Sequence, residues 1–337
     1  MKTIKNQFLR IVTTMMLLFT MIAGLAASLG KEASAASHIG EYKVTLINTD
    51  GRGSTQEKWI AANAYAYFTL PSYTSNQYVS FLGWKCSQDN KTYKGGTRIF
   101  VNSNKTFTGV WKSYARFYTW QGGLITQKTV TTGSTYGTLP SAPAREGYTF
   151  LGWFTSDGIE IKAGTTVTRG YVHDITARYK FEVTTKGGKK TLTDTQVNKL
   201  LKMKWPLPGD HSVASKFGPR NINVPGASTY HQGWDIGGAL NANIVAALDG
   251  TVSYVGYEEN GAGNYVQIDH GNGVKTEYFH CNEILVKKGD KVTAGQTIAR
   301  VGSTGVSSGP HLHFGVQIDG VRIDPEYFLN KAMQKDN

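Results

Sequence analysis

An alternating stretch near the C-terminus decides the fold of this part of the chain: His311-Leu312-His313-Phe314-Gly315-Val316-Gln317-Ile318. Successive side chains of a β-strand point to opposite faces, so an alternation of this kind predicts a strand. One face carries His311, His313, Gly315 and Gln317, whereas the other carries only apolar side chains. The apolar face can be buried while the two histidines look into a groove.

A second motif places a histidine and a carboxylate on one face of another strand. In His231-Gln232-Gly233-Trp234-Asp235 the two side chains are four residues apart, and His280 ends a third predicted strand. Imidazole nitrogens and a carboxylate oxygen suit Zn²⁺, and three protein ligands leave one tetrahedral position open, which is the catalytic arrangement. These strands therefore predict a catalytic site with one zinc ion per chain.

The rest of the C-terminal part also has the pattern of a β domain. Residues 264–269 and 274–281 flank a glycine-rich turn as a hairpin, and Asp319-Gly320 joins 316–318 to 321–323. We expect a compact β-sandwich or barrel hybrid, with β-strands throughout. His270 falls in the first of these turns, where a turn role is favoured over a catalytic one.

Residues 205 to about 330 resemble the catalytic domain of the lysostaphin/LytM-type zinc endopeptidases, which cut the peptide part of peptidoglycan. The matching runs are Ser215-Lys216-Phe217-Gly218-Pro219-Arg220, His231-Gln232-Gly233-Trp234-Asp235-Ile236, Asp249-Gly250-Thr251-Val252, Gly263-Asn264-Tyr265-Val266, Tyr278-Phe279-His280, and Gly302-Ser303-Thr304-Gly305 to Ser308-Gly309-Pro310-His311-Leu312-His313-Phe314. The resemblance implies that His231, Asp235 and His313 hold the zinc. It also implies catalytic roles without metal ligation for His280 and His311, which would activate the water and stabilise the tetrahedral oxyanion.

An internal repeat precedes this domain. Thr69-Leu70-Pro71 to Phe81-Leu82-Gly83-Trp84 recurs as Thr138-Leu139-Pro140 to Phe150-Leu151-Gly152-Trp153, with an offset of 69 residues. Each copy is rich in Thr, Val and Tyr between turn signals, which predicts short strands and little helix. The pattern resembles the internalin B-repeat family, a small β-grasp-like module that implies wall or surface association without catalysis. Trp84 and Trp153 are expected in the module cores rather than as sugar-stacking residues.

The chain divides into five predicted parts. Residues 1–35 have the basic start, the apolar stretch and the Ala33-Ser34-Ala35 cleavage triplet of a signal peptide, with an uncleaved anchor as the alternative. Repeat modules at 41–112 and 113–180 are followed by a basic linker with a short helix at 181–204, where Thr193 and Gln196 have capping-box spacing. The peptidase domain is expected at 205–331. We predict a secreted, wall-associated protein with no stable membrane span after cleavage.

The remaining histidines and the two cysteines are expected to be structurally ordinary. His38, His173 and His211 are predicted on the surface or in loops. Cys86 and Cys281 fall in different predicted domains, so we expect no disulfide between them. Cys281 stands where a small polar residue is expected after His280, and we predict that it is buried in the strand.

The positive charge lies outside the predicted peptidase domain. The chain carries a net charge of +12, with 16 basic and 8 acidic residues at 36–180, 6 and 2 at 181–204, and 10 and 13 at 205–337. Anionic wall polymers are therefore plausible partners of the repeats and linker, and a merely solvated surface is the alternative. Nucleic acid is excluded as a partner because an exported chain does not meet it.

These features together predict a mainly β, secreted zinc endopeptidase that hydrolyses stem or cross-bridge peptides of peptidoglycan and is held at the wall by its repeats. Two alternatives are a non-catalytic activator of another wall hydrolase and an adhesin with a vestigial peptidase domain. Glycine bridges, D-Ala to diaminopimelate links and glycine-rich proteins are all substrates compatible with the sequence.

Overall fold

The computed structural model describes residues 38, 40–50, 53–222 and 225–336. The predicted signal peptide at 1–35 lies outside these residues. The chain forms two compact units, the first including residues up to 143 and 152–178, the second made of 144–151 and 179–337. Among the described helices, none is long and apolar enough to cross a membrane.

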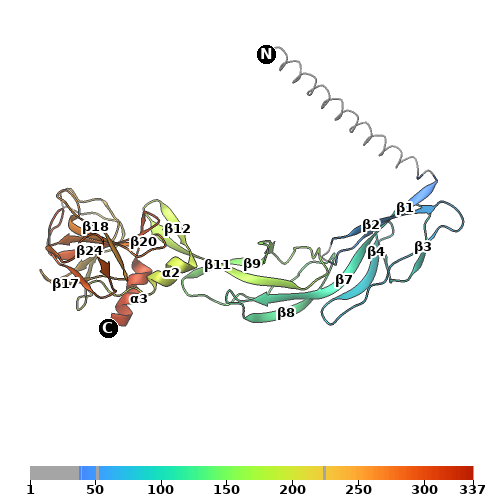
Figure 1. Ribbon diagram of the computed structural model, residues 1–337, viewed down its shortest axis with the longest axis horizontal. Helices are drawn as coiled ribbons and strands as arrows, with labels where there is room; N and C mark the ends of the chain where they lie inside the picture. The colour runs from blue at the N-terminus through green and yellow to red at the C-terminus, as the bar shows by residue number, and fades with distance from the viewer. Residues whose placement is uncertain (1–37, 39, 51–52, 223–224, 337) are drawn as a thin grey trace, which may run out of the picture. The chain divides into compact units, whose positions relative to one another are not determined.

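The first unit is built of strands, as the Thr-, Val- and Tyr-rich sequence predicts (Figure 1). In the first repeat module, β7 pairs in parallel with β1 and antiparallel with β4, and β1 pairs antiparallel with β2. The second module continues this sheet, since β8 pairs antiparallel and β11 parallel with β7. The strands are β1 Glu41–Ile47, β2 Thr55–Ala61, β3 Tyr67–Thr69, β4 Ser80–Cys86, β5 Thr92–Tyr93, β6 Arg98–Phe100, β7 Lys105–Tyr118, β8 Leu124–Thr131, β9 Tyr148–Thr155, β10 Glu160–Ile161 and β11 His173–Thr185.

Both repeat tryptophans are buried, as predicted. The indole of Trp84 donates a hydrogen bond to the carbonyl of Pro71 at 2.8 Å, and that of Trp153 donates to the carbonyl of Pro140 at 3.2 Å. A buried indole must satisfy its single N–H, and the same proline carbonyl does so in each copy. The repeated motif therefore encodes a core residue together with its hydrogen-bond partner.

His173 differs from the prediction of a surface or loop histidine, because it is only 6% exposed. Its Nδ1 is 2.5 Å from the hydroxyl of Tyr136, and its Nε2 is 2.8 Å from the carbonyl of Arg169. Burial lowers the pKa of His173 below the usual value, so the neutral imidazole is favoured in the folded module. His173 begins β11, and Ile175 and Ala177 on the same face of this strand are also buried, so the alternation in the sequence was a signal for its burial.

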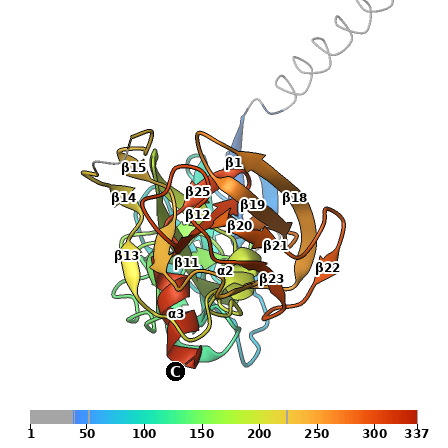
Figure 2. The same cartoon turned by 90° about the vertical axis from the view of Figure 1, so that its left-hand side faces the viewer.

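The second unit contains an antiparallel sheet in the order β13, β16, β24, β20, β19, β18, β22. Figure 2 shows β18, β19 and β20 side by side. Both predicted hairpins are present, as β19 with β20 and as β24 with β25. The strands are β12 Gly188–Leu192, β13 Val213–Ser215, β14 Gly218–Pro219, β15 Tyr230–His231, β16 Trp234–Gly237, β17 Asn243–Val245, β18 Gly250–Glu258, β19 Gly263–Asp269, β20 Val274–Cys281, β21 Glu283–Ile284, β22 Lys291–Val292, β23 Thr297–Arg300, β24 His311–Ile318 and β25 Val321–Ile323.

Two helices pack with this sheet. The predicted capping box is present at α2 Asp194–Leu200, where the Thr193 hydroxyl and the Gln196 side chain satisfy each other's backbone N–H groups. A second helix, α3 Glu326–Asp336, corrects the expectation of strands throughout this part. It forms because Phe328, Leu329 and Ala332 recur at helical spacing and are buried on one face.

The segment predicted as a linker is in large part structured. The end of β11 and strand β12 form a hairpin in which Phe181 pairs with Leu192. Apolar side chains of the hairpin and of α2 are buried in the same core as the sheet: Phe181, Val183, Leu192, Val197, Leu200 and Met203. The compact unit thus begins well before the boundary expected at 204. The apolar residues of this hairpin alternate with period 2 over a short stretch only. The lysines and glycines of the exposed turn dominate the composition, which therefore indicates a linker.

Candidate metal centre

Two neighbouring strands bring the histidine and carboxylate motifs together. Strand β24 lies between β16 and β20, and in this register His313 is opposite Asp235 on one side and Phe279 on the other. His231 comes from the short ribbon of β14 and β15, where it pairs with Gly218. Its side chain is buried, and the Asp235 and His313 side chains retain only a small exposed fraction.

Three candidate ligand atoms lie within contact of one another. The Nε2 of His231, the Oδ1 of Asp235 and the Nδ1 of His313 are separated by 2.9 Å in each of the three pairs. Among the described residues, these side chains make a group whose ligand atoms could hold one metal ion. The cluster contains two imidazole nitrogens and one carboxylate oxygen, a donor set that suits zinc.

Hydrogen bonds from neighbouring polar groups fix the orientation of the side chains in the cluster. The carbonyl of Lys216 accepts a hydrogen bond from Nδ1 of His231 at 2.9 Å, so in the neutral ring the lone pair of Nε2 faces the cluster. Arg220 donates from Nη1 to the second oxygen of Asp235 at 3.1 Å and from Nε to the carbonyl of Ser228 at 3.0 Å. Burial by itself raises the pKa of Asp235, but hydrogen bonds from the two histidines outweigh it and hold the pKa well below the usual value.

Two further histidines lie beside the cluster without belonging to it. The rings of His280 and His311 are 4.7 Å apart between centroids, and Nε2 of His311 is 3.6 Å from Oδ1 of Asp235. Each ring is fixed through Nδ1, which donates to a carbonyl at 2.8 Å, that of Thr304 for His280 and that of Gly309 for His311. Both Nε2 atoms are thus left as acceptors in the neutral rings. Burial lowers the pKa of His280 to about 4.

His280 stands at an unusual backbone position. Its φ angle is +63°, in the left-handed region that residues other than glycine adopt uncommonly, with asparagine, aspartate and histidine as the most frequent exceptions. The residue follows Phe279 at the point where β19 and β20 change register. The irregularity turns the imidazole toward the cavity instead of leaving it in regular strand alternation, so the strand pattern alone could not place it.

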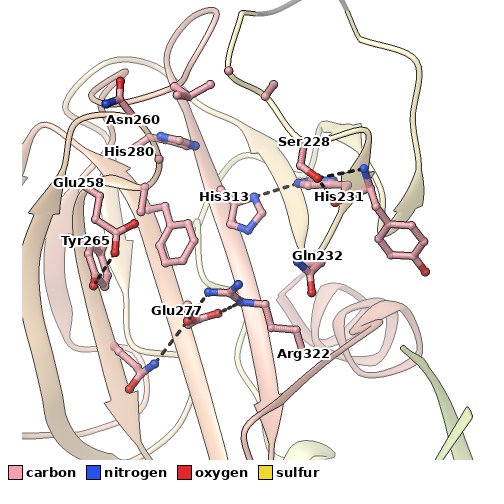
Figure 3. A pocket seen from close by; sticks show the side chains of 18 of the residues that line it. Ser228, His231, Gln232, Glu258, Asn260, Tyr265, Glu277, His280, His313 and Arg322 are labelled. Atoms are coloured by element: carbon pink, nitrogen blue, oxygen red, sulfur yellow. Dashed lines mark hydrogen bonds and ion pairs between the residues drawn. The ribbon is translucent and has the colours of Figure 1, made fainter. Parts of the chain in front are cut away.

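A cavity of about 560 Å³ opens onto the cluster and is lined by His231, His280 and His313 (Figure 3). Its floor contains an ion pair that the sequence analysis did not single out. The buried carboxylate of Glu277 accepts hydrogen bonds from Nε and Nη2 of Arg322 at 2.7 and 3.0 Å. Sequence reasoning also missed Arg220, although it ends the quoted run Ser215–Arg220; an arginine beside a carboxylate ligand leaves no spacing signal.

The cysteines and His270 lie apart from the cluster. Both cysteines are free and buried, and the burial of Cys281 confirms the prediction made for it. Burial raises the pKa of the Cys281 thiol to about 12. His270 is buried in its turn and contacts the carbonyl of Asp249 and the hydroxyl of Thr276. None of these three residues lines the cavity described above.

Comparison with known proteins places this unit in a family. Residues 229–325 match the model of peptidase family M23, and they include all five residues singled out above. The second unit therefore contains a peptidase M23 domain. In the first unit, residues 114–177 match the Listeria-Bacteroides repeat domain, which agrees with the repeat pattern read from the sequence.

Relatives of the M23 domain include enzymes and an activator. An uncharacterized metalloprotease of Haemophilus influenzae is 40% identical over 123 residues, covering 36% of this chain and 26% of that protein. The peptidoglycan DD-endopeptidase ShyC of Vibrio cholerae is 40% identical over 114 residues, covering 34% and 26%. The murein hydrolase activator NlpD of Salmonella dublin is 36% identical over 125 residues, covering 37% and 31%. The chain thus spans about a quarter to a third of these curated relatives.

Among solved structures, the catalytic domain of the antimicrobial peptidase lysostaphin from Staphylococcus simulans is 30% identical to the chain. The match covers 36% of this chain and 92% of the lysostaphin domain, with a TM-score of 0.33. The M23 family is a family of peptidoglycan hydrolases, and this chain carries an M23 peptidase domain behind a repeat region.

Proposed function

We propose that the protein is a zinc-dependent endopeptidase that hydrolyses peptide bonds in the stem or cross-bridge peptides of peptidoglycan. The observation that carries this proposal is the cluster of His231, Asp235 and His313, with His280 and His311 beside it. Relatives that are peptidoglycan endopeptidases support the substrate class. A domain that only activates another enzyme has no need to keep both the candidate ligands and the additional histidines.

His231, Asp235 and His313 would hold the zinc ion. Three ligand atoms at 2.9 Å from one another need a proton or a cation between them, because each offers a lone pair. The bond from His231 to the Lys216 carbonyl fixes the tautomer that ligates through Nε2. Bound zinc would polarise the scissile carbonyl and lower the pKa of a water molecule.

The two other histidines would handle the proton and the developing charge. Because Nδ1 of His280 is committed to the Thr304 carbonyl, its Nε2 is the atom that can accept a proton at the cavity and return it to the leaving amine. His311 is fixed in the same way by Gly309. When its ring is protonated, Nε2 can donate to the oxyanion that forms at the scissile carbonyl.

The experiment that tests the proposal measures zinc and products together. We expect one zinc per chain by metal analysis, release of new muropeptides from purified walls by mass spectrometry, and loss of that release after chelation. His313→Ala should lose both the zinc and the activity, since it removes one of three ligands. A wild-type chain that holds no zinc at neutral pH would contradict the proposal.

The second candidate function is activation of another hydrolase, favoured by the similarity to NlpD of Salmonella dublin. The same wall assay distinguishes catalysis from activation, because no other hydrolase is present with the purified protein. Zinc-loaded protein that releases no muropeptides alone, but increases release by an added hydrolase, would establish activation in place of catalysis.

We further propose that the chain is secreted and that the repeats hold it at the wall. The excess of 8 basic over acidic residues at 36–180 supports attraction to anionic wall polymers. Sedimentation with purified walls should fall steeply between 0.1 and 1 M salt, where the Debye length shrinks from about 10 to 3 Å. Binding that is equal at both salt concentrations would exclude this mode of retention.

A further inference from the structure

A second cavity adjoins the one at the metal cluster. It measures about 440 Å³ and shares Gln232, Gln317 and Arg322 with the first. Its outer wall is the hairpin turn Thr185, Lys186 and Gly187, which precedes the residues matched by the M23 model. The groove of this protein therefore extends beyond the part that the family match covers.

Two polar groups at the junction of the cavities have unused hydrogen-bonding capacity. Arg322 gives Nε and Nη2 to Glu277, and its Nη1 has no hydrogen-bond partner among the described residues. Within the same part of the chain, the side-chain amide of Gln232 has none either. Figure 3 shows Gln232 between His231 and Arg322, so these groups lie next to a candidate metal ligand.

The charge at this junction is positive. Glu277 is buried and its charge is balanced by Arg322, with Gln317 donating a further hydrogen bond at 2.7 Å. Lys186, on the exposed turn, adds a cation with no ion-pair partner among the described residues, and its Nζ is 5.9 Å from the ring centre of Tyr230. Glu258 lines the first cavity but not the second. An anionic group in the groove is therefore favoured at the Arg322 end.

We propose that Arg322, Gln232 and Lys186 form a subsite for a free carboxylate of the peptide substrate, beside the bond that is cut. An arginine edge matches a planar carboxylate, the amide of Gln232 can donate a second hydrogen bond, and the lysine supplies charge. The subsite rests on the proposed function, since it assigns a position to part of the substrate. It selects peptides by a negative charge a short distance from the scissile bond.

The test compares matched peptides. A muropeptide that the protein cleaves is prepared as the free acid, with the terminal carboxylate amidated, and with the side-chain carboxylate amidated. We expect one of the two amidations to raise KM roughly tenfold with little change in kcat, because a charge-assisted contact is lost in binding and not in the chemical step. The amidation that has the effect identifies which carboxylate occupies the subsite.

Variants connect this preference to the named residues. Lys186→Glu and Arg322→Lys should each reduce the preference for the acid; lysine at 322 keeps the charge opposite Glu277 but loses the fork of donors. Lys189→Glu is the matched control, because Lys189 is exposed on the same hairpin and does not line either cavity. It should leave the preference unchanged.

Calorimetric binding of the same peptides to zinc-loaded His280→Asn protein gives a readout that does not depend on turnover. If acid and amides bind and react alike, the subsite is refuted while the endopeptidase proposal stands. If nothing is cleaved but the acid binds more tightly, and Lys186→Glu removes the difference, the subsite stands and the catalytic proposal fails. Loss of the preference in the Lys189→Glu control would also overturn the assignment, because it would trace the effect to general charge.

Discussion

A chain that begins at residue 205 is expected to be unstable, although the sequence pattern places a domain boundary there. Such a cut removes six apolar side chains that are buried in the core of the second unit, from Phe181 to Met203. At roughly 1.5–3 kcal/mol for each buried side chain, the loss is of order 10 kcal/mol. That is comparable with the whole stability of a typical domain, about 5–15 kcal/mol.

Thermal unfolding and zinc content of two truncated chains measure this. A chain starting at residue 179 keeps the hairpin and α2 and is the matched control; it should unfold cooperatively and bind zinc. The chain starting at 205 should be aggregated or show a midpoint lower by tens of degrees, since each kcal/mol shifts Tm by about 2–8 °C depending on domain size. Equal unfolding midpoints for the two chains would show that the hairpin contributes nothing to this core.

Replacing His280 by asparagine is expected to lower turnover by roughly 10²–10⁴, the usual loss when a general base is removed. Asparagine is chosen because it tolerates the left-handed backbone found at this position, with φ +63°. The side chain lies outside the cluster of candidate ligands, so zinc content should remain at one per chain. Metal analysis and muropeptide release on the same preparation check both expectations.

His270→Asn is the control for this variant. His270 is also buried, lies in the hairpin turn that leads into β20, and does not line the cavity at the cluster. It should leave the rate constant of zinc-loaded protein close to that of the wild type. Loss of zinc from His280→Asn would instead make His280 a ligand, and unchanged turnover would remove it from the reaction.

Sequence reasoning could predict the strands of the M23 domain because one face of each is buried. The alternation through His311–Ile318 predicts a strand, and Asp319-Gly320 predicts a hairpin turn after it. The structure has β24 at His311–Ile318 and β25 directly after the turn. The prediction of one strand through His231–Asp235 is wrong, because His231 ends β15 and Asp235 lies in β16, with Gln232 and Gly233 outside both strands. The two side chains still meet at 2.9 Å, because the chain changes sheets between them. Local periodicity was sufficient wherever the chain is regular.

What the sequence could not provide depends on irregular backbone and distant partners. His280 faces the cavity through a positive φ angle, and Arg220 reaches Asp235 from a loop, so neither follows from spacing. Composition predicts a linker where the structure has the hairpin at 181–192, because exposed lysines and glycines outnumber its few core residues. Helix α3 is short, and its three buried side chains do not by themselves distinguish a helix from another local structure.

The register of β24 has a consequence for the order in which the protein is made. Asp235 and His313 meet across two strands although they are 78 residues apart in the chain. Closing so long a loop costs conformational entropy before any contact repays it, which makes this pairing slow. During synthesis, His313 is added 78 residues after Asp235, so the three candidate ligands cannot meet before that point. If these residues hold zinc as proposed, the ion can be bound by all three ligands only after β16 and β24 have paired, which couples metal binding to a late step of folding.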